Sequence, residues 1–369
     1  MIPLFDVKTA DAALRAELLE AAAGVLDSGR YILGPEVERF ESEFARAVGA
    51  PYAVGVSDGT RGLQLALEAV GVGRGDEVIL PAVTFIATAT AVSALGARPI
   101  IADVSPESWT LDPQDFARRI TARTRAVVPV HLYGWPADMD PILETAKRKG
   151  VKVVADCAQA HGALYKGKGV GALGHMGCYS FYPTKNLGAA GDAGMLTTGD
   201  PDLNEACRLL RNCGRKPGDK YLHARIAGHS RLDELQAAFL RVKLRKLDDW
   251  VARRRAVAAR YREAFQGLPV GLPPDGTAGS RHAYHLFILR APDRDNLSRS
   301  LAAAGIDTGV YYPVPVHLQP AYEFLGYTRG DFPVSEKACE EALAIPVHPA
   351  LTDGDVDKVA SAVRAFYKG

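Results

Sequence analysis

Near its middle the chain reads Val151-Lys152-Val153-Val154-Ala155-Asp156, an apolar run that ends in a carboxylate. The residues before it, Ile142, Leu143 and Ala146, follow the spacing of one helical face. A short β-branched run that follows a helix is typical of a buried strand in a parallel sheet. Because ligands bind at the carboxyl ends of such strands, Asp156 is a candidate site residue. The alternative is an aspartate that caps the following turn.

Similar runs recur through the first two thirds of the chain, with helical patterns between several of them. Their regular alternation predicts an α/β fold: a large, mostly parallel, seven-stranded sheet with helices on both faces. The predicted strands are Tyr52 to Val56, Glu77 to Leu80, Arg98 to Ala102, Ala126 to Val130, Lys152 to Ala155, Gly177 to Phe181 and Gly194 to Thr197.

The last third has a different pattern. From about Asp233 to Gln266 it predicts one continuous helix, which ends at the breaker-rich segment from Gly267 to Gly279. Shorter mixed elements follow: a strand from His282 to Leu289, a helix from Arg294 to Ala304, an extended stretch from Thr308 to Tyr312, and terminal helices. We therefore expect a large α/β domain over residues 1–245 and a small C-terminal α+β domain over residues 246–369.

The composition excludes several classes of protein. The 369 residues carry 44 Lys and Arg against 43 Asp and Glu, so the net charge of +1 favours neither nucleic acid nor an anionic membrane surface as a partner. The five cysteines are scattered and form no C-x-x-C pair, which argues for a reducing compartment and against a metal site. With no secretory signal and no membrane-spanning run visible, a cytoplasmic protein is expected.

A glycine-rich segment, Gly169-Val170-Gly171-Ala172-Leu173-Gly174, matches the G-x-G-x-x-G pattern of dinucleotide-binding proteins. That pattern must lie between a strand and the helix that the strand leads into. Here it follows polar residues and precedes a predicted strand. A nicotinamide-dependent oxidoreductase is therefore only a remote alternative.

Ser57-Asp58-Gly59-Thr60 joins the first predicted strand to a helix. The free N–H groups and the positive end of a helix dipole at such a junction can hold a phosphate. The same residues also suit an ordinary helix N-cap.

Lys185 follows another predicted strand and is itself followed by Gly188, Gly191 and Gly194. In this apolar setting desolvation would lower the lysine pKa and make the amine nucleophilic, although an exposed loop lysine is the alternative. A phosphate cradle, an aspartate at a strand end and a desolvated lysine together match the needs of pyridoxal 5′-phosphate (PLP). The aspartate would keep the pyridine nitrogen protonated, and the lysine would bind the cofactor covalently.

At this point the chain resembles the DegT/DnrJ/EryC1/StrS sugar aminotransferases, which have the aspartate aminotransferase fold (fold type I). The resemblance extends over nearly the whole length, and its motifs are specific as a set. They are Gly29 to Val37, Ser57 to Thr60, Pro81 to Thr88, Asp156 to Gly162, Ser180 to Lys185, Gly191 to Gly194, Ser230 to Ala238 and Tyr312 to Pro315.

The resemblance implies roles for individual residues. Lys185 would hold the cofactor and move the proton, while Asp156 would pair with the ring nitrogen. Gln159 would bind the phenolic oxygen and Phe85 would stack on the ring. The phosphate would be held by Gly59, Thr60 and Ser180.

It also implies a homodimer whose active sites are built from both subunits. Family members usually carry an asparagine that reaches the partner's phosphate site, where this chain has His229, which can also donate a hydrogen bond to phosphate. The expected neighbours of the nucleotide-sugar are Arg231, Tyr311, Tyr312 and His317.

The resulting hypothesis is an enzyme of deoxyaminosugar biosynthesis that moves an amino group from L-glutamate to a nucleotide-linked keto-deoxysugar. The segment from Asp156 to Gly162, with its Gln159, favours C-3 of a dTDP-3-keto-6-deoxyhexose. A C-4 or UDP-sugar aminotransferase is the near alternative. Related 3-dehydratases carry histidine in place of the lysine, whereas Lys185 is present here, and a non-catalytic regulator would need a DNA-binding surface that the net charge does not supply.

Overall fold

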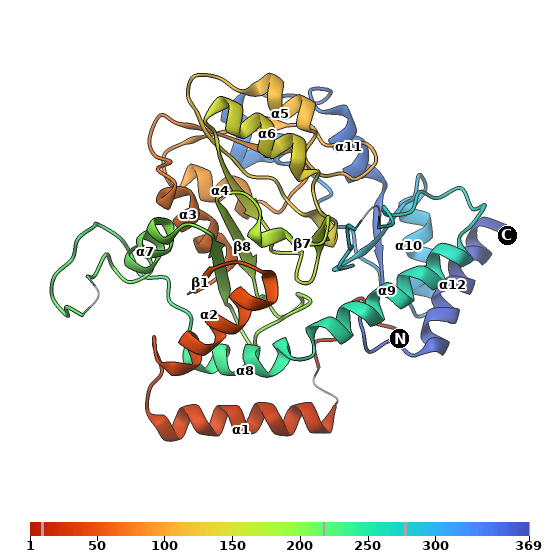
Figure 1. Ribbon diagram of the computed structural model, residues 1–369. Coiled ribbons are helices and arrows are strands. Elements are labelled where there is room, and N and C mark those ends of the chain that lie inside the picture. Colours follow the sequence, from red (N-terminus) through yellow and green to blue (C-terminus); the bar gives the residue numbers. More distant parts are fainter. Residues whose placement is uncertain (9–10, 217, 277–278, 369) are drawn as a thin grey trace.

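The fold is built on a seven-stranded sheet, seen in a computed structural model that describes residues 1–8, 11–216, 218–276 and 279–368 (Figure 1). The strand order is β1-β9-β8-β5-β4-β2-β3. β9 runs antiparallel to both of its neighbours, and the other adjacent pairs are parallel. The strands are β1 (Tyr52–Val56), β2 (Glu77–Pro81), β3 (Arg98–Ala102), β4 (Thr124–Val127), β5 (Lys152–Asp156), β8 (Met176–Ser180) and β9 (Gly194–Thr198).

The predicted α/β fold with a mostly parallel seven-stranded sheet is confirmed. The largest difference in strand bounds is at β4, which ends at Val127 instead of Val130. Pro129 lacks an N–H group, so the regular ladder stops there. The chain nevertheless stays beside β5, because Asp156 N–H donates to the Pro129 carbonyl at 2.9 Å and His131 N–H to the Asp156 carbonyl at 3.0 Å.

Both faces of the sheet are buried under helices. Alternate residues of β5 point to opposite faces: Val153 and Ala155 lie in one apolar core, and Val154 lies in the other. Helices α2 (Pro35–Val48), α5 (Pro113–Arg119), α6 (Met139–Lys149) and α8 (Glu234–Leu244) contribute to the first core. Helices α3 (Gly59–Ala69), α4 (Ala87–Ser93) and α7 (Pro201–Leu210) contribute to the second.

The prediction of one continuous helix from Asp233 to Gln266 is wrong. The chain forms α8, which ends at Leu244, and α9 (Leu247–Ala264). Between them Lys246 N–H donates to the Lys243 carbonyl at 2.9 Å, a tight turn that redirects the chain. No glycine or proline marks this break. In Figure 1, α8 lies between α1 (Ala12–Ser28) and α2, while α9 extends toward α10 (Arg294–Ala303) and α12 (Asp353–Lys368).

The C-terminal part has a core of its own around Tyr261, Phe265 and Phe287. The predicted strand from His282 to Leu289 is shorter, β10 (Phe287–Arg290), and pairs with β11 (Ala342–Ile345), which follows α11 (Pro333–Glu341). The predicted extended stretch from Thr308 to Tyr312 forms only a single bridge, Gly309 with Ala344. Residues 316–332 pack against the second core of the large sheet, and the division at residues 245 and 246 stays a prediction.

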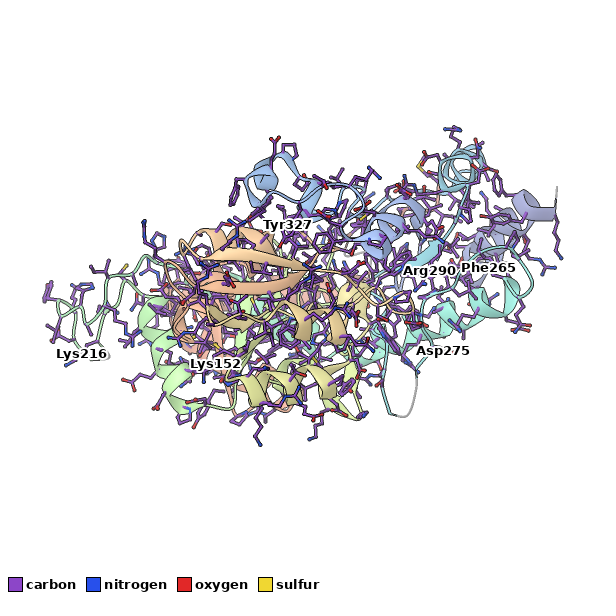
Figure 2. All side chains as sticks on the ribbon, turned by 90° about the horizontal axis from the view of Figure 1, so that it is seen from above. Lys152, Lys216, Phe265, Asp275, Arg290 and Tyr327 are labelled. Atoms are coloured by element: carbon purple, nitrogen blue, oxygen red, sulfur yellow. The ribbon has the colours of Figure 1, made fainter. Side chains whose placement is uncertain are left out.

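An arm formed by the described residues 213–216 and 218–229 projects from the body between α7 and α8. Its two halves pair with each other: Cys213 N–H donates to the Gly228 carbonyl and Ala224 N–H to the Gly214 carbonyl. Figure 2 shows Lys216 at its far end, away from the other labelled residues. Apolar side chains are exposed along it, among them Ile226, which is fully exposed, and Tyr221, which is 81% exposed.

Two expectations drawn from composition can be compared with the described residues. All five cysteines are free, and four of them are buried. Within the ranges that the structure describes, no helix is both long and apolar enough to cross a membrane.

Candidate active site

Asp156 is the last residue of β5 and lies buried at the carboxyl edge of the sheet. Its Oδ1 accepts from the Ala158 N–H at 3.0 Å, and its Oδ2 accepts from the Thr88 hydroxyl at 2.9 Å. Burial raises the pKa of Asp156, and these two hydrogen bonds and the charge of Lys185 oppose the increase. The carboxylate is therefore held at one fixed position by two donors.

Lys185 lies in the loop after β8, where its N–H donates to the Tyr182 carbonyl at 2.9 Å. Burial lowers the pKa of the Lys185 amine to about 8, and the Asp156 carboxylate only partly offsets this effect. With that pKa about a tenth of the amines are neutral at pH 7, far more than for an exposed lysine. The amine is therefore suited to act as a nucleophile and as a proton carrier.

The turn from β1 into α3 forms a polar cradle. The Asp58 carboxylate caps the helix by accepting from the Arg61 N–H at 2.8 Å, and Gly59 and Thr60 begin the helix, where N–H groups have no acceptor within the helix itself. A Cβ at Gly59 would lie 2.8 Å from the Cβ of Ser180, so only glycine lets the end of β8 approach this closely. Gly59, Thr60 and Ser180 thus meet at one place.

Gln159 connects this edge of the sheet to the C-terminal part. Its Oε1 accepts from the Tyr133 N–H, and its Nε2 donates to the Tyr312 hydroxyl, both at 2.6 Å. The rings of Tyr133 and Tyr312 stack with centroids 6.1 Å apart, and Phe85 lies 6.4 Å from Tyr312 with 56% of its surface exposed. Both tyrosines have positive φ, 57° and 60°, a strained backbone for a bulky residue.

The other residues predicted for substrate or phosphate lie at different places. Tyr311 packs edge-on against Tyr312, so it belongs to the same aromatic group. Arg231 and His229 lie at the root of the arm, where Arg231 contacts the Asn212 side chain at 3.4 Å and His229 is exposed. Ser230, between them, is buried and lies 2.9 Å from the Ser57 hydroxyl.

His317 is not brought to the aromatic group. Its ring is almost fully buried, with Nε2 3.0 Å from the Glu336 carboxylate and the ring against Phe332. In the described residues it therefore serves packing between the C-terminal part and the large sheet, and its predicted contact with a substrate has no support from this geometry.

The glycine-rich segment from Gly169 to Gly174 begins at the end of a short hairpin, β6 (Leu164–Tyr165) and β7 (Lys168–Gly169), and continues through one 3₁₀ turn, Val170–Ala172. It leads into strand β8 rather than into a helix. The strand–loop–helix context of a dinucleotide site is therefore missing at this segment.

A buried carboxylate, an amine with a lowered pKa, an open N–H cradle and an exposed aromatic ring thus meet at one edge of the sheet. The model of the DegT/DnrJ/EryC1/StrS aminotransferase family matches residues 12–364. The chain belongs to this family. The resemblance seen in the sequence motifs is confirmed.

Two relatives of this family member act on nucleotide-sugars according to their names. The dTDP-3-amino-3,4,6-trideoxy-alpha-D-glucose transaminase of Streptomyces venezuelae is 49% identical, over 99% of this chain and 96% of the relative. The UDP-N-acetyl-3-dehydro-alpha-D-glucosamine 3-aminotransferase of Acidithiobacillus ferrooxidans is 41% identical, over 100% and 98% of the two chains. The crystal structure of S. venezuelae DesV matches with a TM-score of 0.97 at 48% identity and covers 100% of this chain and 99% of that one.

This family member is thus a PLP-dependent aminotransferase, and the prediction of the cofactor is confirmed. The residues present fit PLP on the chain's own geometry. Gly59 opens the N–H cradle that a Cβ would close, Lys185 offers an amine with a depressed pKa, and Phe85 leaves an aromatic face exposed.

The sequence alone assigns no individual role to two residues of this site, Thr88 and Tyr133. Thr88 lies within the motif from Pro81 to Thr88, but its donation to Asp156 across 68 positions could not be inferred from spacing. Tyr133 acts through its backbone N–H, which carries no residue-specific signal.

Proposed function

We propose that the chain transfers an amino group from L-glutamate to C-3 of a dTDP-3-keto-6-deoxyhexose. The observation that carries the proposal is the lowered pKa of Lys185 beside the fixed carboxylate of Asp156, in a chain about half identical to a dTDP-3-aminosugar transaminase. The 41% identical UDP-sugar relative favours a second candidate, the 3-keto group of a UDP-sugar. A C-4 enzyme is the further alternative.

The proposed roles follow from the geometry. When bound, the cofactor supplies an electron sink for the carbon that loses its proton. With the cofactor in place, the Lys185 Nζ would carry the proton between the substrate carbon and the cofactor, and its lowered pKa of about 8 favours the neutral amine that accepts a proton. The negative charge of the Asp156 carboxylate would stabilise the protonated ring nitrogen, and the N–H groups of Gly59 and Thr60, with the Ser180 hydroxyl, would bind the phosphate.

The remaining contacts are proposed from the aromatic group and the arm. Phe85 would cover one ring face, and the Gln159 Nε2, already oriented by Tyr133, would donate to the phenolic oxygen. Tyr311, Tyr312 and Arg231 would contact the nucleotide-sugar. His317, held by Glu336, is left out of this set.

An absorbance titration tests the function. The purified protein is expected to show the chromophore of bound PLP, to lose it with L-glutamate, and to regain it on addition of a dTDP-3-keto-6-deoxyhexose. A matched panel of UDP- and C-4 keto-sugars identifies the acceptor. Recovery with no keto-sugar of the panel would contradict the proposed reaction.

We further propose a homodimer in which the arm of one subunit reaches the site of its partner. Large apolar side chains are exposed on α1 at Leu19 and Leu26, at Tyr31 and Ile32, and along the arm. Exposed apolar surface of this extent is typical of a protein–protein interface, and a two-fold axis would place the same surface on both subunits.

A variant at His229 tests whether the sites are shared. His229→Ala is expected to loosen the cofactor most in its amine form, which has no covalent bond to Lys185. Loss of one hydrogen bond to a charged group costs about 1.5–3 kcal/mol, or roughly a tenfold to hundredfold weaker affinity. Equilibrium dialysis of the amine form measures this, with the exposed His223→Ala in the same arm as the control.

Mixing His229→Ala with Lys185→Ala subunits separates the two possible arrangements. If His229 serves the partner's site, each mixed dimer has one site with both lesions and one with neither, so activity rises above that of both parents. If it serves its own chain, as its neighbour Ser230 beside Ser57 also permits, each mixed site carries one lesion. Activity no higher than the weighted parental mean, after confirmed subunit exchange, counts against the shared site.

A further inference from the structure

A cavity of about 370 Å³ opens behind the loop that carries Lys185. Its walls come from the N-terminal segment, the 183–188 loop, the helices α8 and α9, and residues 348–350. The cationic side chains that line it are Lys8, Lys185, Lys243 and Arg254, and the acidic ones are Asp6 and Asp11. A net positive wall directly beside the reactive amine points to an anionic ligand.

Arg254 is the unusual member of this wall. It is only 5% exposed, and its Nη1 donates to two carbonyls, of Tyr284 at 3.1 Å and of His285 at 3.4 Å. Its Nε has no hydrogen-bond partner within the described residues. Burial lowers the pKa of Arg254 to about 9, and no carboxylate in the described part of the chain forms an ion pair with it.

Two other arginines, one equally buried and one next to Arg254 in sequence, each form an ion pair with a carboxylate. Arg211, equally buried, pairs with the Glu41 carboxylate. Arg253, next to Arg254 on α9, pairs with Asp353 at 2.9 Å. A buried cation without a counter-ion is costly, so Arg254 is expected to gain its partner from a bound ligand.

The shape of the guanidinium and the size of the cavity narrow the ligand class. The planar fork of arginine matches the two oxygens of a carboxylate. A volume of 370 Å³ is at the low end for ligand pockets, which suits a small amino acid better than a nucleotide-sugar. Asp6 and Asp11 on the same wall would also disfavour a diphosphate, which carries more negative charge than one carboxylate.

We propose that this cavity binds a carboxylate of the amino donor and that Arg254 is the residue that holds it. The inference rests on the proposed transamination. Of the two substrates, the amino donor is the one that carries both an amino group, which must come close to Lys185, and a carboxylate, which can lie in the adjoining cavity. It would add a specificity determinant for the donor that is separate from the aromatic group at Gln159.

The test measures ligand binding and the two half-reactions of the holoenzyme. Glutarate, a dicarboxylate without an amino group, is titrated calorimetrically into wild type, Arg254→Met and the matched control Arg253→Met, whose arginine lies on the same helix but pairs with Asp353. We expect Arg254→Met to weaken glutarate binding and the donor half-reaction with L-glutamate by roughly tenfold to hundredfold. Arg253→Met and the keto-sugar half-reaction are expected to stay within about twofold of wild type.

A second variant covers the case in which Arg254→Met does not fold. Ala350 is exposed and lines the cavity, so Ala350→Glu adds a competing carboxylate without removing a buried group. It is expected to weaken glutarate binding in the same direction. Repeating the donor half-reaction with L-alanine, which has only the α-carboxylate, shows which carboxylate of glutamate is bound. A lower rate with glutamate alone assigns the side-chain carboxylate, and an equally lowered rate with alanine assigns the α-carboxylate.

The proposal would be overturned if wild type bound no measurable glutarate, or if both cavity variants bound it as tightly as wild type. It would also be overturned if the variants slowed only the keto-sugar half-reaction, because that result would assign the cavity to the diphosphate. If the wild-type protein transfers no amino group at all, the proposed function fails. The glutarate titration still decides whether the cavity binds a carboxylate.

Discussion

Lys185→Ala is expected to lower the rate of amino transfer by at least about a thousandfold, since both the covalent attachment and the proton carrier are lost. Burial lowers the pKa of the Lys185 amine to about 8, and Lys243, another lysine of the same cavity wall, donates to the Gly188 carbonyl instead. Single-turnover measurement of both half-reactions gives the rate. The exposed Lys149→Ala at the end of α6 is the control and should keep full activity.

The same variant should also change how stability depends on pH. In the folded apoprotein Lys185 releases its proton near pH 8, whereas the unfolded chain keeps it up to about 10.5. Because the unfolded state then holds more protons, wild-type stability gains a contribution as the pH rises from 8 to 10.5. Denaturant unfolding of the Lys185→Ala apoprotein should lack that gain. Wild-type turnover, or an unchanged pH dependence, would contradict the assignment.

Asp156→Asn is expected to lower the rate by about a hundredfold to a thousandfold, the usual loss when one preorganised electrostatic partner is removed. An amide keeps the oxygen that accepts from the Ala158 N–H, but it cannot hold a protonated ring nitrogen by charge. Rapid-mixing absorbance with L-glutamate measures the loss.

Thr88→Val is the matched control for Asp156. It removes the hydroxyl that donates to Asp156 Oδ2 and leaves the carboxylate charge in place. A much smaller loss, within about tenfold, is expected, because only one neutral donor is removed. Equal effects of the two variants would mean that Asp156 acts by positioning the turn rather than by its charge.

Most of the strands could be predicted from sequence because they are short apolar runs, several of them rich in β-branched residues, and are largely buried. The carboxyl ends of the parallel strands β5 and β8 meet at one edge, which is why the order of strands and helices along the chain was enough to place Asp156 near the residues after β8. The break after Leu244 could not be predicted, because the residues there are good helix formers and neither glycine nor proline marks the turn.

Contacts between distant segments could not be predicted either. The amide of Gln159 is oriented by residues 133 and 312, and no local pattern links these positions. The family resemblance implies that His317 contacts the nucleotide-sugar, yet its ring lies against Glu336 from α11. Arg254 lies in a run of three arginines, and only the structure shows that the middle one is buried.

The left-handed backbone at Tyr133 and Tyr312 constrains how this protein can diverge over time. Such a conformation costs about 1–3 kcal/mol at each residue and persists only where the surroundings enforce it. Glycine at either position would relax the backbone but lose the stacked ring, and alanine would keep the strain without the ring. Because the two rings stack on each other, replacing one tyrosine removes the contact of the other while that residue still carries its strain. Replacement of both tyrosines together is therefore expected to be better tolerated than replacement of either one alone.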